Sequence, residues 1–141
     1  METIDQIELH DSVAYVTRNV GEVILELRPA YVHHWRQVGG QWQGIGRTQT
    51  ARIRLTAGRV VPDLHLTAAE IADGWIRVGD DLYDNLLPVP FTRVGAVTGR
   101  IELVNAEPIE LWGTAIGVEL IGPSKDIEEL PAEWAPVRRA V

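Results

Sequence analysis

Val23-Ile24-Leu25-Glu26-Leu27-Arg28 places apolar side chains at its odd-numbered positions and charged ones at Glu26 and Arg28. Successive residues of a β-strand point to opposite faces, so this stretch predicts a strand with one buried and one solvated face. The same period of two recurs at residues 52–55, 100–103 and 116–120. We therefore expect a mainly β fold in which one core contains Val23, Leu25, Leu27, Ile53, Leu55, Ile101, Leu103, Val118 and Leu120.

Turn-forming residues separate the expected strands at short intervals. Asn19-Val20-Gly21 joins residues 13–18 to residues 22–32 and predicts a β-hairpin. Thr56-Ala57-Gly58 predicts a second hairpin in the same way, and further strands are expected at residues 75–78, 82–83 and 109–112. Short strands with turn signals roughly every 8–12 residues indicate an antiparallel β-sandwich or a flattened barrel.

Two stretches carry helix signals. Thr67-Ala68-Ala69-Glu70 fits a capping box, and Gly74 stands where a helix often ends, which predicts a short helix at residues 68–73. Ser124 fits the N-cap of a second helix that contains Asp126 and ends before Pro131. We therefore expect one or two short helices within the all-β fold.

Length and composition predict one globular domain over residues 1–141. The chain is 45% hydrophobic and 23% charged, and it contains no cysteine, which excludes disulfides and thiolate chemistry. Residues 131–141 have two prolines and no periodicity, so we expect a C-terminal tail held by Trp134. The acidic start has no signal-peptide pattern and no apolar run reaches about 20 residues, which predicts a cytoplasmic protein without membrane contacts.

Acidic residues outnumber basic ones, 20 to 13, for a net charge of −7. A chain of this charge is poorly suited to neutralise phosphates, which argues against nucleic acid as a partner. Residues 1–70 hold eight acids and seven arginines, a net of −1, whereas residues 71–141 hold twelve acids and six bases, a net of −6. The second half of the chain is therefore expected to steer any basic partner.

Asp80, Asp81 and Asp84 surround Tyr83 in a predicted hairpin. A calcium loop would also need a central glycine and a bidentate glutamate, which this segment lacks. Two interpretations stay open for these four residues: a contact surface for a basic protein partner, or a solvated turn.

The segment Tyr83-Asp84-Asn85-Leu86-Leu87-Pro88-Val89-Pro90, together with His10-Asp11 and the strand pair that ends at residues 113–122, carries a resemblance. With these residues the chain resembles small, uncharacterised bacterial β-rich proteins, over residues 7–32 and 63–122. The resemblance implies a β-rich fold. It brings no known activity, so no catalytic residue transfers from it.

Residues 38–46 form the longest irregular stretch and are expected to be a loop. An indole between two amides, as in Gln41-Trp42-Gln43, could stack on a sugar ring while the amides bind its hydroxyls. A protein-contact loop and a flexible loop are the alternatives. Of the five tryptophans, Trp42 lies within this stretch and Trp35 lies just before it, and these two are the best candidates for recognition.

Histidines and carboxylates offer only a weak metal site. Asp63 and His65 share a face if they lie on one strand, and His10 and His33 are the other weak candidates, but no histidine pair has helical ligand spacing. His10-Asp11-Ser12 does not form a catalytic triad on a strand, because neighbouring side chains point to opposite faces. We therefore expect no metal, no cofactor and no catalytic residue.

The sequence is typical of a non-enzymatic binding or interaction protein with a basic protein partner. Immunity proteins that neutralise toxins share this size and acidity, by analogy alone. The first alternative is a small-ligand or carbohydrate-binding module that uses residues 35–46, and the second is a metal-dependent enzyme of jelly-roll type. The expected binding residues are Trp35, Gln41, Trp42, Gln43, Asp80, Asp81, Tyr83 and Asp84.

Overall fold

The computed structural model describes residues 2–63 and 66–136, and the predicted antiparallel all-β fold is confirmed there. A single 3₁₀ turn, η1 (Ala132–Trp134), is the one helical element of the described residues. Within these residues there is no helix that is long and apolar enough to cross a membrane. The strands are β1 (Thr3–Glu8), β2 (Val13–Asn19), β3 (Glu22–Val38), β4 (Gln41–Thr56), β5 (Arg59–Val61), β6 (Leu66–Val78), β7 (Asp81–Asp84), β8 (Leu86–Val89), β9 (Phe91–Leu103) and β10 (Ile109–Leu130).

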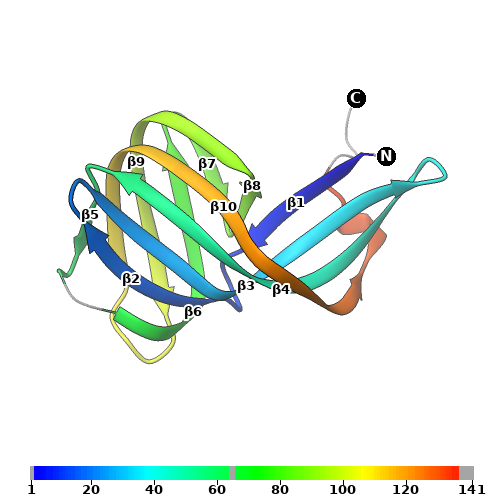
Figure 1. Cartoon of the computed structure of the whole chain (residues 1–141), viewed down its shortest axis with the longest axis horizontal. Coiled ribbons are helices and arrows are strands. Elements are labelled where there is room, and N and C mark those ends of the chain that lie inside the picture. Colours follow the sequence, from blue (N-terminus) through cyan, green and yellow to red (C-terminus); the bar gives the residue numbers. More distant parts are fainter. Residues whose placement is uncertain (1, 64–65, 137–141) are drawn as a thin grey trace.

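All strands belong to one sheet, and six of them follow one another round a partial ring (Figure 1). The order is β2-β6-β9-β10-β4-β3, and β3 also pairs with β2. The β2–β6 side is the shortest contact of the ring, because only Val13, Ala14 and Val16 of β2 are in register with β6. Strands β1 and β8 continue the sheet from β3, while β5 pairs with β10 and β7 pairs with β6.

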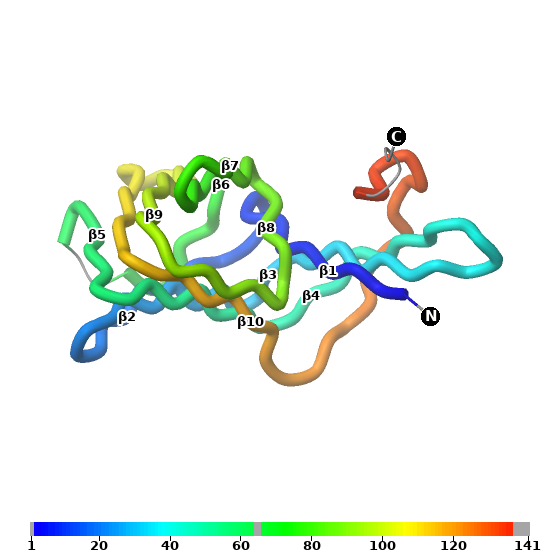
Figure 2. Tube along the Cα trace, turned by 90° about the horizontal axis from the view of Figure 1, so that it is seen from above, coloured from blue at the N-terminus to red at the C-terminus, as the bar shows by residue number. Residues whose placement is uncertain are grey.

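Strands β3, β4 and β10 are longer than the ring and extend beyond it (Figures 1 and 2). Their outer parts, with β1, form a projection that we call the arm: residues 3–8, 30–49 and 125–130. Gly39 and Gly40 connect β3 to β4 at its tip with φ of +59° and +79°. Such left-handed conformations at both turn positions favour glycine and produce a tight two-residue hairpin.

The main core lies inside the ring. The alternation at Val23, Leu25 and Leu27 predicts inward positions correctly, and the expected core residues of β4, β9 and β10 are buried in the same cluster, with Leu120 partly buried against it. Ile7, Leu9 and Leu87 join this cluster from the β1–β8 side.

Two bulges mark the junction between the ring and the arm. Between Leu27 and Ala30, β3 has one residue more than the facing part of β4, and β10 has extra residues between Ile121 and Lys125. Bulges bend a strand and increase its twist, which lets the arm leave the curvature of the ring. The Gln49 side chain donates from Nε2 to the Gly122 carbonyl in the second bulge (2.6 Å).

Both expected helices are wrong. Residues 68–73 lie in β6, where Glu70 faces Val13 and Ile71 faces Leu103, and residues 125–130 of β10 pair with β4. Ala68 has a φ of +50°, which a right-handed helix excludes. Capping signals are local, and here pairing with distant strands overrides them.

Two other expectations are also corrected. Residues 38–46, expected as an irregular loop, form the tip of the β3–β4 hairpin, because two glycines at positive φ allow both strands to continue. Strand β5 does not form a hairpin with β4 but pairs with β10. At the C-terminus, η1 and Ala135 dock on the arm, while the rest of the expected tail, residues 137–141, lies outside the described residues.

Candidate functional site

Four side chains meet where β1 ends, and we call them the Glu8 cluster: Glu8, His10, Asp11 and His33. The His33 ring donates from Nε2 to Glu8 Oε1 (2.6 Å), while His10 Nδ1 lies 3.4 Å from Glu8 Oε2 and 3.3 Å from Asp11 Oδ2. The antiparallel register of β1 and β3 places Glu8 opposite Tyr31, so His33, two residues along β3, shares its face. The sheet thus joins residues 25 positions apart in the chain.

Glu8 is held in its ionised form. The hydrogen bond from His33 lowers the pKa of Glu8 below its ordinary value of 4.5, and this effect exceeds the opposing one of partial burial. The charge of His33 when protonated and the nearby His10 act in the same direction. His33 itself is 5% exposed, so the Glu8–His33 pair is largely shielded from solvent.

Backbone hydrogen bonds fix the turn that carries His10 and Asp11. Asn85 accepts from the Leu9 amide through its carbonyl (2.8 Å) and from the His10 amide through Oδ1 (2.8 Å). The buried Ser12 hydroxyl donates to the Glu8 carbonyl (2.7 Å) and accepts from the Tyr31 amide (3.0 Å). The turn is therefore held from both β3 and the β7–β8 corner.

Aromatic rings flank His33 on two sides. The Tyr31 ring makes an edge contact with it at a centroid distance of 5.7 Å, and Trp134 stacks on it at 6.1 Å with an interplanar angle of 17°. The Tyr31 hydroxyl donates to the Glu128 carboxylate of β10. Burial and this hydrogen bond raise the pKa of Tyr31 above its ordinary value of 10.0.

A hollow of about 360 Å³ opens beside the cluster. It is lined by Glu8, His33, Asn85, Leu86 and Trp134, and Trp134 is 55% exposed. A carboxylate, an amide and an indole together favour a cationic or hydrogen-bonding group.

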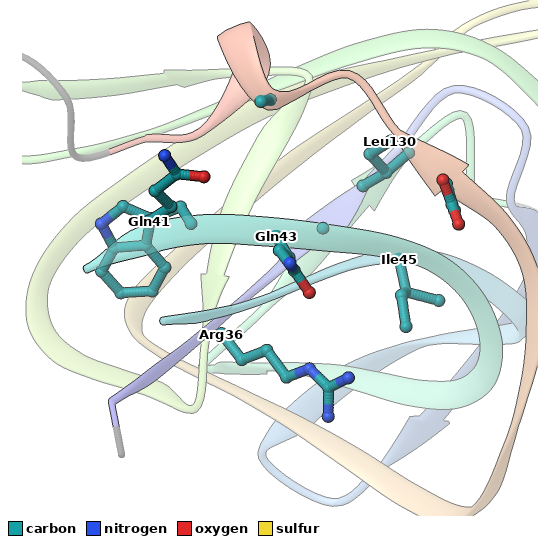
Figure 3. A pocket seen from close by; sticks show the side chains of 9 residues that line it. Arg36, Gln41, Gln43, Ile45 and Leu130 are labelled. Carbon is teal, nitrogen blue, oxygen red and sulfur yellow. The ribbon is translucent and has the colours of Figure 1, made fainter. Parts of the chain in front are cut away.

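A second hollow, also about 360 Å³, lies along the arm (Figure 3). Figure 3 shows Arg36, Gln43 and Ile45 on one side of the β4 ribbon and Leu130 on the other. The hollow therefore follows the edge of β4 beyond the end of β10, where Leu130 is the last paired residue. Its lining comprises Arg36, Gln41, Trp42, Gln43, Gly44, Ile45, Glu129, Leu130 and Ala132.

Of the residues expected to bind there, Gln41, Trp42 and Gln43 line the arm hollow, whereas Trp35 is fully buried. Trp35 packs with Leu130 and Ala135 and contacts Trp42 in a small second core. Because successive side chains of a strand alternate, Trp42 faces this core and the two glutamines face away. The Trp42 indole and the two glutamine amides therefore lie on opposite faces of β4. In a loop, as expected from sequence, they could have lain side by side.

The acidic hairpin has the predicted β6–β7 pairing. Asp80 is exposed at its turn, but Asp81 binds Arg93 (2.5 Å). Tyr83 is half-buried, packs against the core and makes an edge contact with Phe91 at 5.2 Å. Asp84 is exposed and faces Trp75 in the register.

The weak metal candidates separate. His10 and His33 meet at Glu8, but Asp63 binds Arg18 (2.5 Å) and lines another hollow, and His65 lies outside the described residues. Sequence reasoning missed Glu8 and the role of Asp11. The spacing of Glu8, His10 and Asp11 at a strand end was a usable signal, whereas the approach of His33 depends on strand register.

No protein-family model matches the chain, and no curated protein or solved structure shows significant similarity to it. The resemblance of residues 83–90 to small bacterial β-rich proteins stays a prediction. Function is therefore inferred from the chemistry of the residues described above.

Proposed function

We propose that the protein is a non-enzymatic binding protein that engages a basic protein partner through one outer face of the ring. This acidic face comprises Glu70, Asp73, Trp75, Asp84 and Glu102. The observation that carries the proposal is a half-exposed tryptophan on β6 with carboxylates on β6 and on both neighbouring strands.

The sheet register supports a common outward orientation. Trp75 is flanked by the buried Gly74 and Ile76, so its side chain points away from the core. Asp84 faces Trp75 from β7. On β9, Glu102 lies between the buried Ile101 and Leu103, so it points outward too.

Asp73 and Glu102 face each other directly in the β6–β9 register. Like charges at such positions repel, and Arg100, which lies opposite Trp75, already offsets part of this charge through Glu102. Asp73 and Asp84 are therefore the acids that favour a cationic group from outside the sheet. Arg100 is already bound by Glu102 (3.4 Å) and Glu110 (3.0 Å). Carboxylates speed the encounter with a basic partner, and a central tryptophan is the usual type of buried anchor.

This face replaces the hairpin tip as the favoured contact surface. Tyr83 turns towards the core and Asp81 is neutralised by Arg93, so neither is well suited to serve a partner. Asp84 belongs to both sets and remains a candidate.

The test uses a partner captured by cross-linking in the producing cell and then purified. Asp73→Asn with Asp84→Asn should slow association and reduce its dependence on salt, while Trp75→Phe should mainly raise the dissociation rate. Glu2→Gln with Glu133→Gln removes the same charge from exposed positions elsewhere and is the matched control. A partner without net positive charge, or rates that respond equally to both double variants, would contradict the proposal.

A small-ligand or carbohydrate-binding module is the second candidate, supported by the arm hollow. Trp42, Gln41 and Gln43 line it with Arg36 and Glu129, which provides hydrogen-bonding groups beside an indole. It ranks lower because alternation places the amides and the indole on opposite faces of β4. Binding in a glycan array that is lost in Trp42→Ala and retained in Trp75→Phe would favour it.

We also infer that the ring is a flattened barrel and not a two-sheet sandwich. The pairing of β2 with both β6 and β3 supports this arrangement, because it connects the two ends of the six-strand order. Nuclear Overhauser contacts from β2 to both neighbours would support it, and contacts to β3 alone would contradict it.

A further inference from the structure

We propose that Glu8, His10 and Asp11 bind one divalent transition-metal ion, at a site separate from the acidic face. One ligand atom from each residue lies within 4.8 Å of the others. In residues 2–63 and 66–136 this is the one group of three such side chains that converges in this way.

The donor separations fit a small cation. Metal–ligand bonds of about 2.1 Å in tetrahedral geometry place neighbouring donor atoms about 3.4 Å apart. His10 Nδ1 lies 3.4 Å from Glu8 Oε2 and 3.3 Å from Asp11 Oδ2. The Glu8 and Asp11 ligand atoms lie within 4.8 Å of each other, so closer approach of the two carboxylates would let all three residues share one ion.

The donor set also selects the type of ion. One imidazole and two carboxylates suit zinc and related divalent metals, whereas calcium prefers six to eight oxygen ligands. Three protein ligands leave a coordination position for water or another ligand, and Glu8 also lines the hollow beside Trp134.

Surrounding hydrogen bonds hold the ligands in place. His33 binds Glu8 Oε1, which leaves Oε2 directed towards His10. Asn85 fixes the His10 amide, and Ser12 fixes the Glu8 carbonyl. Such outer partners orient ligands in metal sites and strengthen binding.

His34 and Asp5 form an ordinary histidine–carboxylate pair, with which the three proposed ligands can be compared. His34 Nδ1 lies 2.6 Å from Asp5 Oδ1. These residues face each other in the β1–β3 register, at positions that alternate with those of Glu8 and His33. Their side chains therefore lie on the opposite face of the sheet, and this pair is not part of the convergent group.

The test titrates chelator-treated full-length protein with Co²⁺, followed by its d–d absorption, and with Zn²⁺ by equilibrium dialysis. We expect one ion per chain and displacement of Co²⁺ by Zn²⁺. His10→Gln and Asp11→Asn should each weaken binding at least about tenfold, and His33→Leu, which leaves the three ligands, by about 10–100-fold. His34→Gln should bind as the wild type does.

Folding is checked on the metal-free variants by far-ultraviolet circular dichroism. Asn tolerates the left-handed conformation of Asp11 (φ +73°), so Asp11→Asn keeps the turn. Glu8→Gln is a further ligand variant if either of the others misfolds. Stoichiometry far below one, or affinity unchanged in the folded ligand variants, would refute the site. Asp73→Asn with Asp84→Asn should leave metal binding intact, which separates this test from that of the proposed function.

Discussion

Gly44 and Gly46 of β4 leave the space that two aromatic side chains of β3 occupy. A Cβ at Gly44 would lie 2.6 Å from Trp35 Cε3, and one at Gly46 would lie 2.7 Å from Tyr31 Cζ. Real Cβ atoms do not approach this closely, so either substitution would displace a ring. These glycines allow Trp35 to reach Leu130 and Tyr31 to reach Glu128, across β4.

Gly44→Ala should therefore destabilise the protein by about 1–3 kcal/mol through overpacking. Gly117→Ala is the matched control, because a Cβ there meets nothing within 4 Å and the residue also lies in a strand. Urea unfolding of both variants gives the comparison. Equal stabilities for the two would show that Trp35 does not pack on Gly44.

Tyr31→Phe should cost about 1 kcal/mol, because it removes the hydroxyl that donates to Glu128. The raised pKa also predicts a pH dependence: this contribution is complete below pH 10.0, the ordinary value, and is lost as the pH rises through the folded-state pKa. The tyrosinate absorbance of the wild-type protein should therefore exceed that of Tyr31→Phe only above pH 10.0. Ionisation of Tyr31 below that pH would contradict the prediction.

Sequence alternation predicted core residues such as Leu25 and Ile53, because burial of one strand face is a local property. It did not predict the meeting of Glu8 with His33, which depends on how β1 and β3 are aligned. Trp35 was misjudged for a similar reason: the partners that bury it, Leu130 and Ala135, lie at the far end of the chain.

The arm has its own small core. Trp35, Leu130 and Ala135 form it, with Ile4 and Trp42 packed against them. This cluster is much smaller than the core of the ring, so the arm should open at a lower free energy than the ring does.

Trp35→Ala should accelerate amide hydrogen exchange in residues 33–38 and 41–46 while the ring keeps its protection. The reason is that the substitution removes the largest side chain of the arm core and touches nothing inside the ring. Mass spectrometry of exchanged peptides measures this. Equal acceleration in peptides from β9 would indicate one cooperative unit.

The elements themselves were predicted unevenly. Hairpins such as β2–β3 and β6–β7 depend on short turns and were found from sequence. The capping box at Thr67–Glu70 led to a false helix, since the pairing of β6 with β2 and β9 outweighs a local signal. The glycines before Gln41 are typical of an irregular loop when read from sequence, but in the structure they allow a tight turn between two long strands.

The ring depends on contacts between segments that are distant in the chain. Leu25→Ala should reduce the free energy of unfolding by about 2–5 kcal/mol, because Leu25 is fully buried in the ring core. Leu103→Ala, at an 8% exposed position, should fall at the lower end of that range. Both variants should unfold in a single transition in urea, and a loss below about 1 kcal/mol in Leu25→Ala would place that side chain outside the core.

The circuit of strands could not be predicted from sequence. Pairings such as β10 with β4 and β2 with β6 join segments far apart in the chain, and strand faces alone do not identify partners. All-β class follows from periodicity, whereas the order of strands follows from packing of the complete core.

The bulge of β3 between Leu27 and Ala30 changes which residues of the strand, the odd-numbered or the even-numbered ones, point into the core. Before it, odd-numbered Val23, Leu25 and Leu27 enter the core, and after it the even-numbered Ala30 and Val32 do so. The odd-numbered side chains after the bulge therefore point to the other face of the sheet, where His33 contacts Glu8. A regular strand that kept all these residues but lacked the bulge would direct His33 into the core and Val32 out of it, whereas deleting Arg28 would remove the extra residue and leave both faces unchanged. One extra residue in the bulge therefore decides on which face of the sheet the Glu8 cluster can form.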